Sequence, residues 1–531
     1  MHLILLIASI CCILALWLLP VFLAGFPFVF PALARSVRDF LQTGLITPDT
    51  LRLPTLLVAP IAHILTWENT TAWVVLNASV FAAGLLIWWV TVEKLFSYRF
   101  AWISTIIMAL MPMYWVEALA VGGYAFSFFF LFLGFACFVY TQERSRILAI
   151  ILFGICFGAT LACRDAFLTF IPWLVVAYAY LYRSQRLQTA LHIALFLCVT
   201  YVSFALPLLP NALQEDLSPR ERITVFLPTA SARVPGSGHL YPDDYIFEYH
   251  REAYDTVIAQ RVEDSSFLKR QEDQHYRYIF GIGDFSLFDG LLNGFWLTVH
   301  TFPQLLIQEY IGGAFLWLFI LPGIAWFYRE RRKLLFLMAG LWISMELILR
   351  FVLHFGRSHL MDIGFIFALL AAAGVATIAE GLPQKIRKVS VWKCTVLITI
   401  IISLQLLQAN RKLLAHKYSR STVPEIYAVS AVLRDLPEDV FIVHPRRNDL
   451  FHMVHRPNRT LNTPSIDFLE EHGLLIEPFE RYGVTHILGY DPEYIARLQQ
   501  VAPRVHVLEI PEDVPNISYS PLIRYLLHLV R

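Results

Sequence analysis

The chain has 531 residues, of which 57% are hydrophobic and only 16% are charged. Soluble domains carry about 25% charged residues, so this composition excludes an ordinary soluble protein and indicates a polytopic membrane protein. The formal net charge of +1 gives no argument for a nucleic-acid or strongly acidic partner. The seven cysteines lie in or beside apolar runs without metal-ligand spacing, so we expect no disulfide framework and no cysteine metal site.

Apolar runs near the ~20 residues that cross a bilayer recur along the chain. The first run has no basic segment before it and no small-residue cleavage site, so it is predicted to be a retained span and not a signal peptide. We expect eleven spans, at 3–25, 72–93, 99–116, 123–141, 146–163, 166–182, 188–209, 311–328, 334–355, 361–379 and 391–409.

The basic residues of the short loops define an orientation. They gather in the connections between spans 2 and 3, 4 and 5, 6 and 7, 8 and 9, and 10 and 11. Because short loops rich in Lys and Arg stay cytoplasmic, the N-terminus is predicted inside and the C-terminus outside. The outer face then carries the loop 26–71, the segment 210–310 and the tail beyond residue 410.

These outer segments have patterns of their own. The loop 26–71 is the first place where charges gather among aromatic residues and prolines. In 210–310 we expect polar helices at 243–264 and 267–279 and an amphipathic interfacial helix at 287–306. The charged residues of its first part, up to Pro60, are Arg35, Arg38, Asp39, Asp49 and Arg52.

The tail changes character near residue 411, where the apolar runs shorten to strand length. Short β-like runs at 441–443, 485–488 and 505–508 alternate with helical patterns at 426–433, 465–472 and 492–500. This alternation predicts a small α/β domain at 411–531, outside a transmembrane domain at 1–410. The tail has no Gly-rich phosphate loop, which argues against a nucleotide-binding role.

Six segments, taken in order with the topology, resemble a known superfamily. They are the loop helix Val37–Gly44, the proline-rich Leu51–Pro54 with Pro60, Met111–Phe130, Gly154–Pro172 with Arg164 inside, Gly356–His359, and Arg481–Leu488. Together they resemble the GT-C superfamily of integral-membrane glycosyltransferases, in the branch of bacterial protein mannosyltransferases and lipid A aminoarabinose transferases. The resemblance covers most of the chain.

The resemblance implies a GT-C fold in a bacterial inner membrane and a polyprenyl-phosphate-linked sugar as donor, used on the outer face. It also implies a divalent cation in some members and none in others. From its residues alone, His239 with Asp243 and Asp244 is either a cation site or a solvated loop. Family members carry acidic residues in the first outer loop, where this chain has Val29 and Phe30. Either another carboxylate serves as the base, or the chain no longer catalyses transfer.

Transfer of a sugar from a lipid phosphate needs a base for the acceptor and a cation for the leaving phosphate. Asp39 and Asp49 are the candidate bases, and Glu117 is a second candidate acid. Alternatively, Asp39 forms an i,i+4 ion pair with Arg35. The alternative for Glu117 is a solvated carboxylate at the membrane interface without a catalytic role.

Arginine is best suited to grip phosphate oxygens, and three residues are candidates for donor-phosphate binding: Arg164, Arg357 and His359. Alternatively, Arg164 and Asp165 neutralise each other in a turn between two apolar runs. The alternative for Arg357 and His359 is that they serve only the membrane topology. The candidate acceptor and loop contacts are Arg38, Asp165, Tyr241 and Asp243.

The sequence therefore predicts a membrane glycosyltransferase that passes a sugar, with inversion, to a lipid-linked glycan, lipid or protein acceptor at the outer face. One alternative is a non-catalytic GT-C homologue that binds a lipid-linked glycan or acts as a scaffold. The other is a transporter of lipid-linked sugar. The transporter hypothesis has less support because intramembrane charges are few and the two halves of the sequence show no corresponding pair of Gly/Pro-broken helices.

Overall fold

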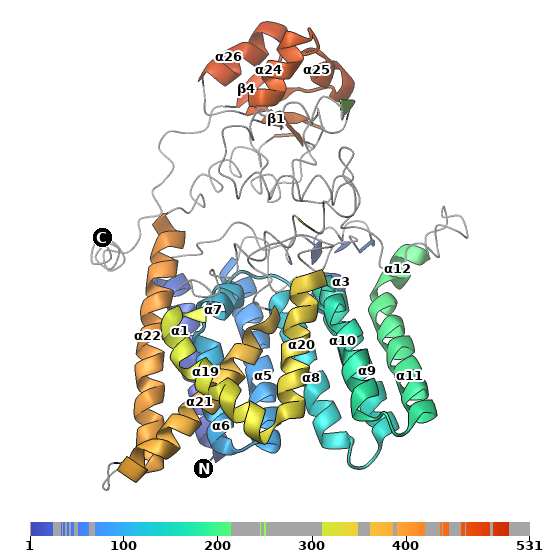
Figure 1. The fold of residues 1–531 in the computed structure, drawn as a ribbon. Coiled ribbons are helices and arrows are strands. Elements are labelled where there is room, and N and C mark those ends of the chain that lie inside the picture. Colours follow the sequence, from blue (N-terminus) through green and yellow to red (C-terminus); the bar gives the residue numbers. More distant parts are fainter. Residues whose placement is uncertain are drawn as a thin grey trace.

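The protein is described here by a computed structural model, which defines two folded parts. The described residues are 2–24, 51–62, 70–213, 311–348, 362–385, 390–419 and most of 436–444, 458–488 and 492–508, with single residues at 33–46, 245–250 and 292. One part is a bundle of long helices, and the other is a small parallel sheet with helices near the C-terminus (Figure 1). The N-terminus lies at the end of the bundle opposite the sheet.

Long apolar helices occupy the positions where apolar runs occur in the sequence. They are α1 (His2–Ala24), α5 (Thr70–Leu95), α6 (Tyr98–Leu110), α8 (Tyr124–Thr141), α9 (Arg146–Cys163), α10 (Ile171–Leu181), α11 (Arg186–Ala205), α19 (Ala314–Glu330), α20 (Arg332–Ile348), α21 (Gly364–Lys385) and α22 (Val391–Ser419). Within the described residues, six helices are long and apolar enough to cross a membrane, or seven if one bent pair counts as a span. The chain is thus a multi-pass membrane protein, and eleven spans remain a prediction.

Short elements lie at the end of the bundle that faces the sheet. They are α3 (Arg52–Val58) with the 3-10 helix η1 (Ala59–Ile61), α7 (Pro112–Leu119), the 3-10 helix η2 (Asp165–Phe170), and η3 (Leu206–Leu208) with α12 (Leu209–Ala212). Broken, irregular backbone is tolerated at membrane depth only where protein or water satisfies its polar groups. This concentration of short helices therefore marks the end of the bundle where a polar site can be built.

The span predicted at 99–116 is divided between two helices. Helix α6 ends at Leu110, Met111 adopts an extended conformation (φ −60°, ψ 130°), and α7 starts at Pro112, bent by 64° from α6. The cause is local, because a proline lacks the N–H that an interior helical residue donates and disfavours the α conformation in the residue before it. The bend directs α7 away from the axis of α6.

Large aromatic side chains and small residues fill the bundle. Trp17, Phe81, Tyr114 and Phe128 are fully or almost fully buried, and their rings contact one another in a chain across α1, α5, α7 and α8. Glycines allow close approach of α19 and α21, where a Cβ on Gly323 would collide with the backbone of the partner helix. Small residues at such crossings are the usual way in which membrane helices pack.

The C-terminal part is a four-stranded, fully parallel sheet. The strands β1 (Ile442–His444), β2 (Asn458–Thr460), β3 (His486–Leu488) and β4 (His506–Leu508) pair in the order β2-β1-β3-β4. Parallel neighbours require crossover connections, and the described ones are α24 (Thr463–Glu471), α25 (Glu477–Tyr482) and α26 (Pro492–Val501). Three strands and two helices thus lie where the sequence pattern predicts them.

The sheet and its helices have a hydrophobic core of their own, separate from that of the bundle. Tyr245, from the long segment between α12 and α19, is fully buried in this second core. Its hydroxyl donates to Glu477 Oε2 at 3.0 Å, and His250 Nε2 lies 3.1 Å from the same oxygen. The long segment is therefore joined to the C-terminal part at this point. The helices predicted at 267–279 and 426–433 lie outside the described residues. So do those predicted at 243–264 and 287–306, apart from residues 245, 249, 250 and 292.

Candidate functional site

The site begins where α9 stops. Its C-cap residue is Arg164, which takes an extended conformation (φ −159°, ψ 112°) before η2 starts at Asp165. The helices on both sides are apolar, with Pro172 in the first turn of α10. Because the chain passes directly from one apolar element to the next, Arg164 lies at the end of the bundle without a polar loop around it. The guanidinium therefore needs partners inside the protein.

Arg164 pairs with a carboxylate from a distant part of the chain. Its Nε lies 3.4 Å from Oδ1 of Asp362, whose side chain is 0% exposed, while that of Arg164 is 15% exposed. The guanidinium also lies over the ring of Tyr124, 3.7 Å from the centroid. A buried charge is costly unless it is paired. Asp362 just precedes α21, where the positive end of the helix dipole further favours a carboxylate.

Two predicted acids lie within electrostatic range of this arginine. Burial lowers the pKa of the Arg164 guanidinium, but four neighbouring side chains raise it, and the net shift is upward. In decreasing order of effect, these neighbours are Tyr124, Asp362, Asp165 and Glu117. The structure thus brings together Glu117, Arg164 and Asp165 from three elements. We call Arg164, Asp362, Tyr124, Glu117 and Asp165 the Arg164 cluster.

Helix α7 positions Glu117. The buried side chain of Asn77 on α5 donates to the carbonyl oxygens of Glu117 and Ala118, at 2.9 Å each, and so satisfies the end of α7. The Glu117 carboxylate is half-buried, and its Oε2 would lie 3.8 Å from a Cβ placed on Gly122. Because Asn77 belongs to a long membrane helix, the acid sits on a rigid support.

The turn after α7 is strained. Val121 has a positive φ of 50°, a conformation that costs a β-branched residue of order 1–3 kcal/mol and is often found at functional sites. The amide of Leu33, in the first outer loop, donates to the Val121 carbonyl at 3.4 Å. The first outer loop therefore reaches the turn that follows Glu117.

A second largely buried arginine lies close to the turn that follows α7. A Cβ on Gly123 would lie 2.5 Å from the Cys163 carbonyl oxygen and 2.8 Å from Leu51 Cδ2, so three chain segments meet there. The residue after Leu51 is Arg52, which is 5% exposed, with its guanidinium 4.7 Å from the centroid of the Phe204 ring. The first outer loop thus supplies a cation next to the segment that carries Arg164.

Three residues of this site were missed by the sequence prediction: Asp362, Tyr124 and Arg52. Asp362 had a signal, since it lies at the start of the apolar run 361–379, and charges in such a position are often functional. Tyr124 had none, because aromatic residues are common in membrane helices. The predicted residues Arg38, Asp39, Asp49, Tyr241, Asp243, Arg357 and His359 lie outside the described residues.

The cluster has the chemical parts for binding an anion beside carboxylates. Arginine side chains offer parallel N–H donors that match phosphate oxygens, and acids near them can accept a proton from a hydroxyl group. Among the residues that the structure describes, no group of three or more His, Cys, Asp or Glu side chains is arranged to hold a metal ion. The described part of the site therefore offers arginines as the positive charges.

Comparisons with solved structures identify the fold. The chain is similar to ArnT from Cupriavidus metallidurans bound to undecaprenyl phosphate, with a TM-score of 0.53 and 11% identity over 95% of this chain and 89% of ArnT. It is also similar to the archaeal oligosaccharyltransferase AglB from Archaeoglobus fulgidus, in complex with an inhibitory peptide and a dolichol-phosphate, with a TM-score of 0.56 and 12% identity over 95% of this chain and 71% of AglB. No protein-family model and no curated protein matches the sequence.

The chain is a multi-pass membrane protein, and its fold is similar to the folds of ArnT and AglB. Within that class its architecture is shared with ArnT over nearly the full length of both chains. At these identities the likeness concerns the fold, and function has to be argued from the Arg164 cluster.

Proposed function

We propose that this protein is a membrane glycosyltransferase that takes a sugar from a polyprenyl-phosphate carrier and transfers it to an acceptor hydroxyl or amine at the outer face of the membrane. The observation that carries the proposal is the Arg164 cluster, in which a largely buried arginine and several carboxylates meet at one end of a GT-C bundle. Two GT-C structures of this architecture hold a polyprenyl phosphate, undecaprenyl phosphate in ArnT and dolichol-phosphate in AglB.

In this proposal Arg164 binds the donor phosphate, with Arg52 as the second cation. As the bond between the anomeric carbon and the phosphate oxygen breaks, both electrons stay on that oxygen, and the arginines neutralise the charge that develops. Asp362 holds the guanidinium of Arg164 in place, because a paired arginine keeps one orientation. Arg357 and His359 remain proposed donor-phosphate contacts.

Glu117 is the proposed general base, ahead of Asp39 and Asp49, because it lies in the field of Arg164. The carboxylate takes the proton of the acceptor as the acceptor atom attacks the anomeric carbon from the side opposite the phosphate, which inverts the configuration. A base in this position contributes about 10²–10⁴-fold to the rate. Asp165, Arg38, Tyr241 and Asp243 are proposed to contact the acceptor, which is a glycan, lipid or protein.

The proposed orientation places the N-terminus in the cytoplasm and the C-terminal sheet outside, in a bacterial inner membrane. The proposal rests on the basic residues of the short loops. Helix α7, which carries Glu117 of the Arg164 cluster, lies at the end of the bundle opposite the N-terminus (Figure 1), so the cluster would face outward. Membrane-impermeant labelling of single cysteines introduced into the α8–α9 loop and into α26 would test the orientation.

A non-catalytic homologue that binds a lipid-linked glycan is the second candidate, favoured by Val29 and Phe30 where the family carries acids. Binding and turnover distinguish the two functions. Undecaprenyl phosphate binding to the purified full chain should weaken at least ~10-fold in Arg164→Ala, the effect of losing about 1.4 kcal/mol. It should be unchanged in Glu117→Gln and in the matched control Arg497→Ala, which alters an arginine on helix α26 of the C-terminal part.

Transfer from a panel of polyprenyl-phosphate sugars in proteoliposomes should then be lost in Glu117→Gln, whose binding is intact. Wild-type binding without any transfer would support the non-catalytic homologue. Equal binding in Arg164→Ala and wild type would exclude Arg164 as the phosphate contact, and with it the proposed site.

A further inference from the structure

The break between α6 and α7 leaves backbone carbonyl groups without their helical donors. In a continuous helix each carbonyl oxygen accepts from the N–H four residues later, so Ala109 and Leu110 would accept from residues 113 and 114. The bend interrupts this pattern, and the Tyr114 N–H donates to the Met111 carbonyl at 3.0 Å instead. Because buried carbonyl groups need hydrogen-bond donors at membrane depth, the end of α6 depends on donors from elsewhere in the bundle.

Side chains of two distant helices supply these donors. Trp17 Nε1, on α1, donates to the Ala109 carbonyl at 2.9 Å, and Asn410 Nδ2, on α22, donates to the Leu110 carbonyl at 2.6 Å. The same Asn410 nitrogen also donates to the Leu406 carbonyl of its own helix at 2.9 Å. Both side chains are buried. The end of α6 is thus held by helices that lie far from it in the sequence.

The far end of α7 is held in the same way. Asn77 on α5 donates to the carbonyl oxygens of Glu117 and Ala118. Asn410 therefore fixes the backbone just before α7, and Asn77 fixes it at the end of α7. Neither asparagine belongs to α6 or α7, so the direction of α7 relative to the bundle depends on both bonds.

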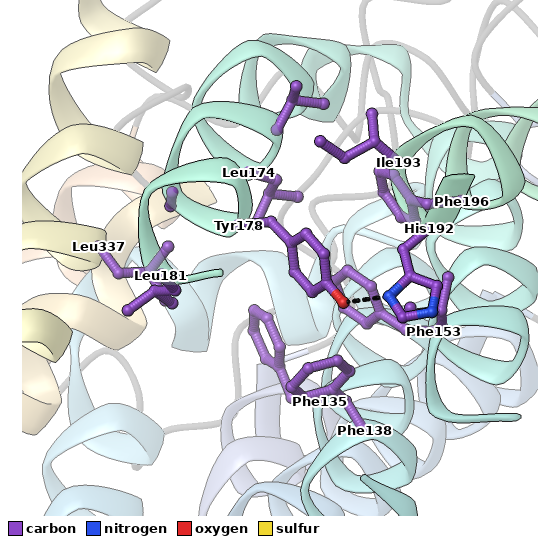
Figure 2. A pocket seen from close by; sticks show the side chains of 13 residues that line it. Phe135, Phe138, Phe153, Leu174, Tyr178, Leu181, His192, Ile193, Phe196 and Leu337 are labelled. Atoms are coloured by element: carbon purple, nitrogen blue, oxygen red, sulfur yellow. Dashed lines mark hydrogen bonds between the residues drawn. The ribbon is translucent and has the colours of Figure 1, made fainter. Parts of the chain in front are cut away.

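A polar pair elsewhere in the bundle differs from these contacts. The Tyr178 hydroxyl on α10 and His192 Nδ1 on α11 are 2.8 Å apart and share a hydrogen bond in the wall of an apolar cavity (Figure 2). This bond joins two side chains, which can change rotamer, so it constrains the backbone only weakly. The bonds of Trp17, Asn77 and Asn410 end on the main chain and constrain the path of the backbone itself.

A small change in the direction of α7 moves Glu117 by a distance that matters for catalysis. Glu117 lies about 8 Å along the helix axis from Pro112, the first residue of α7, at ~1.5 Å per residue. A tilt of about 10° at the start of this helix therefore displaces Glu117 by about 1 Å. A misplacement of about 1 Å can lower the rate of a reaction about 10²-fold.

We infer that Asn410 is a positioning residue for Glu117. It holds the Leu110 carbonyl and so fixes the direction in which α7 presents the carboxylate. The inference rests on the proposed function, in which Glu117 is the general base. Asn410 contacts neither donor nor acceptor in this arrangement, and its effect falls on the chemical step and not on binding of the donor phosphate at Arg164.

The test measures transfer and phosphate binding separately on the purified full chain. Asn410→Leu keeps the branch at Cγ and removes the hydrogen-bond donor. It should lower kcat for transfer from a polyprenyl-phosphate sugar in proteoliposomes by about 10²-fold and leave the binding of undecaprenyl phosphate unchanged. A loss of kcat without a loss of binding is typical of a group that acts in the transition state.

Asn410→Gln separates the donor from the packing of the side chain. Glutamine keeps the amide N–H groups but is one methylene longer, whereas leucine matches the shape of asparagine. If the donor positions Glu117, Asn410→Gln should retain more of the wild-type kcat than Asn410→Leu. Packing alone predicts the reverse order, because extra methylenes in a well-packed core are unfavourable.

Thr399→Val is the matched control on the same helix. The Thr399 side chain is buried, and its hydroxyl donates to the Thr395 carbonyl of α22 itself at 2.8 Å. This variant loses a buried hydrogen bond without a change at α6, so it should keep the wild-type kcat. Asn410→Ser serves as a second variant if Asn410→Leu does not fold, because a serine hydroxyl bonds the carbonyl four residues earlier in its own helix and is too short for Leu110. Thermal unfolding checks the fold of each variant.

The inference is overturned if Asn410→Leu or Asn410→Ser keeps the wild-type kcat, or if Asn410→Gln is no more active than Asn410→Leu. It is also overturned if undecaprenyl phosphate binding is lost together with transfer, or if Thr399→Val loses as much kcat, because the effect is then structural. Loss of kcat at unchanged binding, with Asn410→Gln above Asn410→Leu, supports it. A wild-type protein that transfers no sugar would instead refute the proposed function, and with it the role of Glu117 on which the inference depends.

Discussion

Among the residues that the structure describes, the arginine–carboxylate clusters around Arg164 and Arg497 differ in burial more than in chemistry. In the C-terminal part, between α26 and α24, Arg497 Nη2 lies 2.7 Å from Asp467 Oδ1 and also bonds Glu470, but the Asp467 side chain is 59% exposed. In the bundle, Arg164 lies farther from its partner, at 3.4 Å, and that partner, Asp362, is fully buried. Exposed ion pairs contribute about 0–1 kcal/mol, whereas removal of one partner from a buried pair costs about 3–5 kcal/mol. The burial of the ion pairs, and not the distance between their charged atoms, therefore decides in which cluster the loss of one partner costs more free energy of unfolding.

Removal of the buried carboxylate should have the largest effect. Asp362→Ala leaves the Arg164 charge without its acid and should lower the free energy of unfolding by about 3–5 kcal/mol, measured by denaturation in detergent micelles. The double variant Arg164→Met, Asp362→Leu should recover most of this stability and still fail to bind undecaprenyl phosphate. An unfolding curve of Asp362→Ala that matches wild type would show that the pair is not desolvated.

The packing beside the Arg164 cluster, between Gly123 and Cys163, can be disturbed without a change of charge. Gly123→Ala places a Cβ 2.5 Å from the Cys163 carbonyl oxygen, and such overpacking costs about 1–3 kcal/mol. Because Cys163 precedes Arg164, phosphate binding should weaken together with stability.

Gly381→Ala is the matched control, since a Cβ there meets nothing within 4 Å. It should unfold at or above the wild-type midpoint, because alanine favours the helix. If Gly123→Ala behaved like this control, the corner formed by Leu51, Gly123 and Cys163 would not be tightly packed.

The contact between the long segment and the C-terminal sheet should depend on alkaline pH. Burial and the hydrogen bond to Glu477 raise the pKa of Tyr245 to about 12, from about 10 in an unfolded chain. Stability from this group is therefore complete below about pH 10 and is lost as the pH rises to about 12.

Tyr245→Phe should lose about 0.5–1.5 kcal/mol at neutral pH and show a smaller decline in stability between pH 10 and pH 12 than wild type. Unfolding midpoints of both proteins across this range measure the difference. Identical declines would mean that other tyrosines account for the whole effect.

The exposed cluster should matter least. Arg497→Ala should change the free energy of unfolding by no more than about 1 kcal/mol, and the change should shrink further at high salt, because exposed pairs are screened. A loss of several kcal/mol would contradict the ranking of the two clusters by burial.

Local sequence patterns predicted much of the fold. The long apolar helices follow from runs of hydrophobic residues, and the strands β1, β3 and β4 follow from short apolar runs between turn residues. The break at Pro112 could also have been predicted, because the proline rule is local. Its consequence, the 64° bend that positions Glu117, could not.

The candidate site shows the limit of such patterns. Arg164 and Glu117 stood out because charges beside apolar runs are rare. The partner of Arg164 could not be identified, since Asp362 lies just before α21, nearly two hundred residues away, and nothing local to either residue encodes the pairing. Arg52 had the same difficulty, as its contact with Phe204 depends on how α3 meets the end of α11.

Composition and periodicity alone thus determined that this protein is a multi-pass membrane protein with an α/β segment near its end, because the hydrophobic effect and backbone hydrogen bonding act on neighbouring residues. Only the tertiary structure decided which charges share one environment. Those outcomes depend on packing between segments far apart in the chain, where close approach at a residue such as Gly123 sets the geometry.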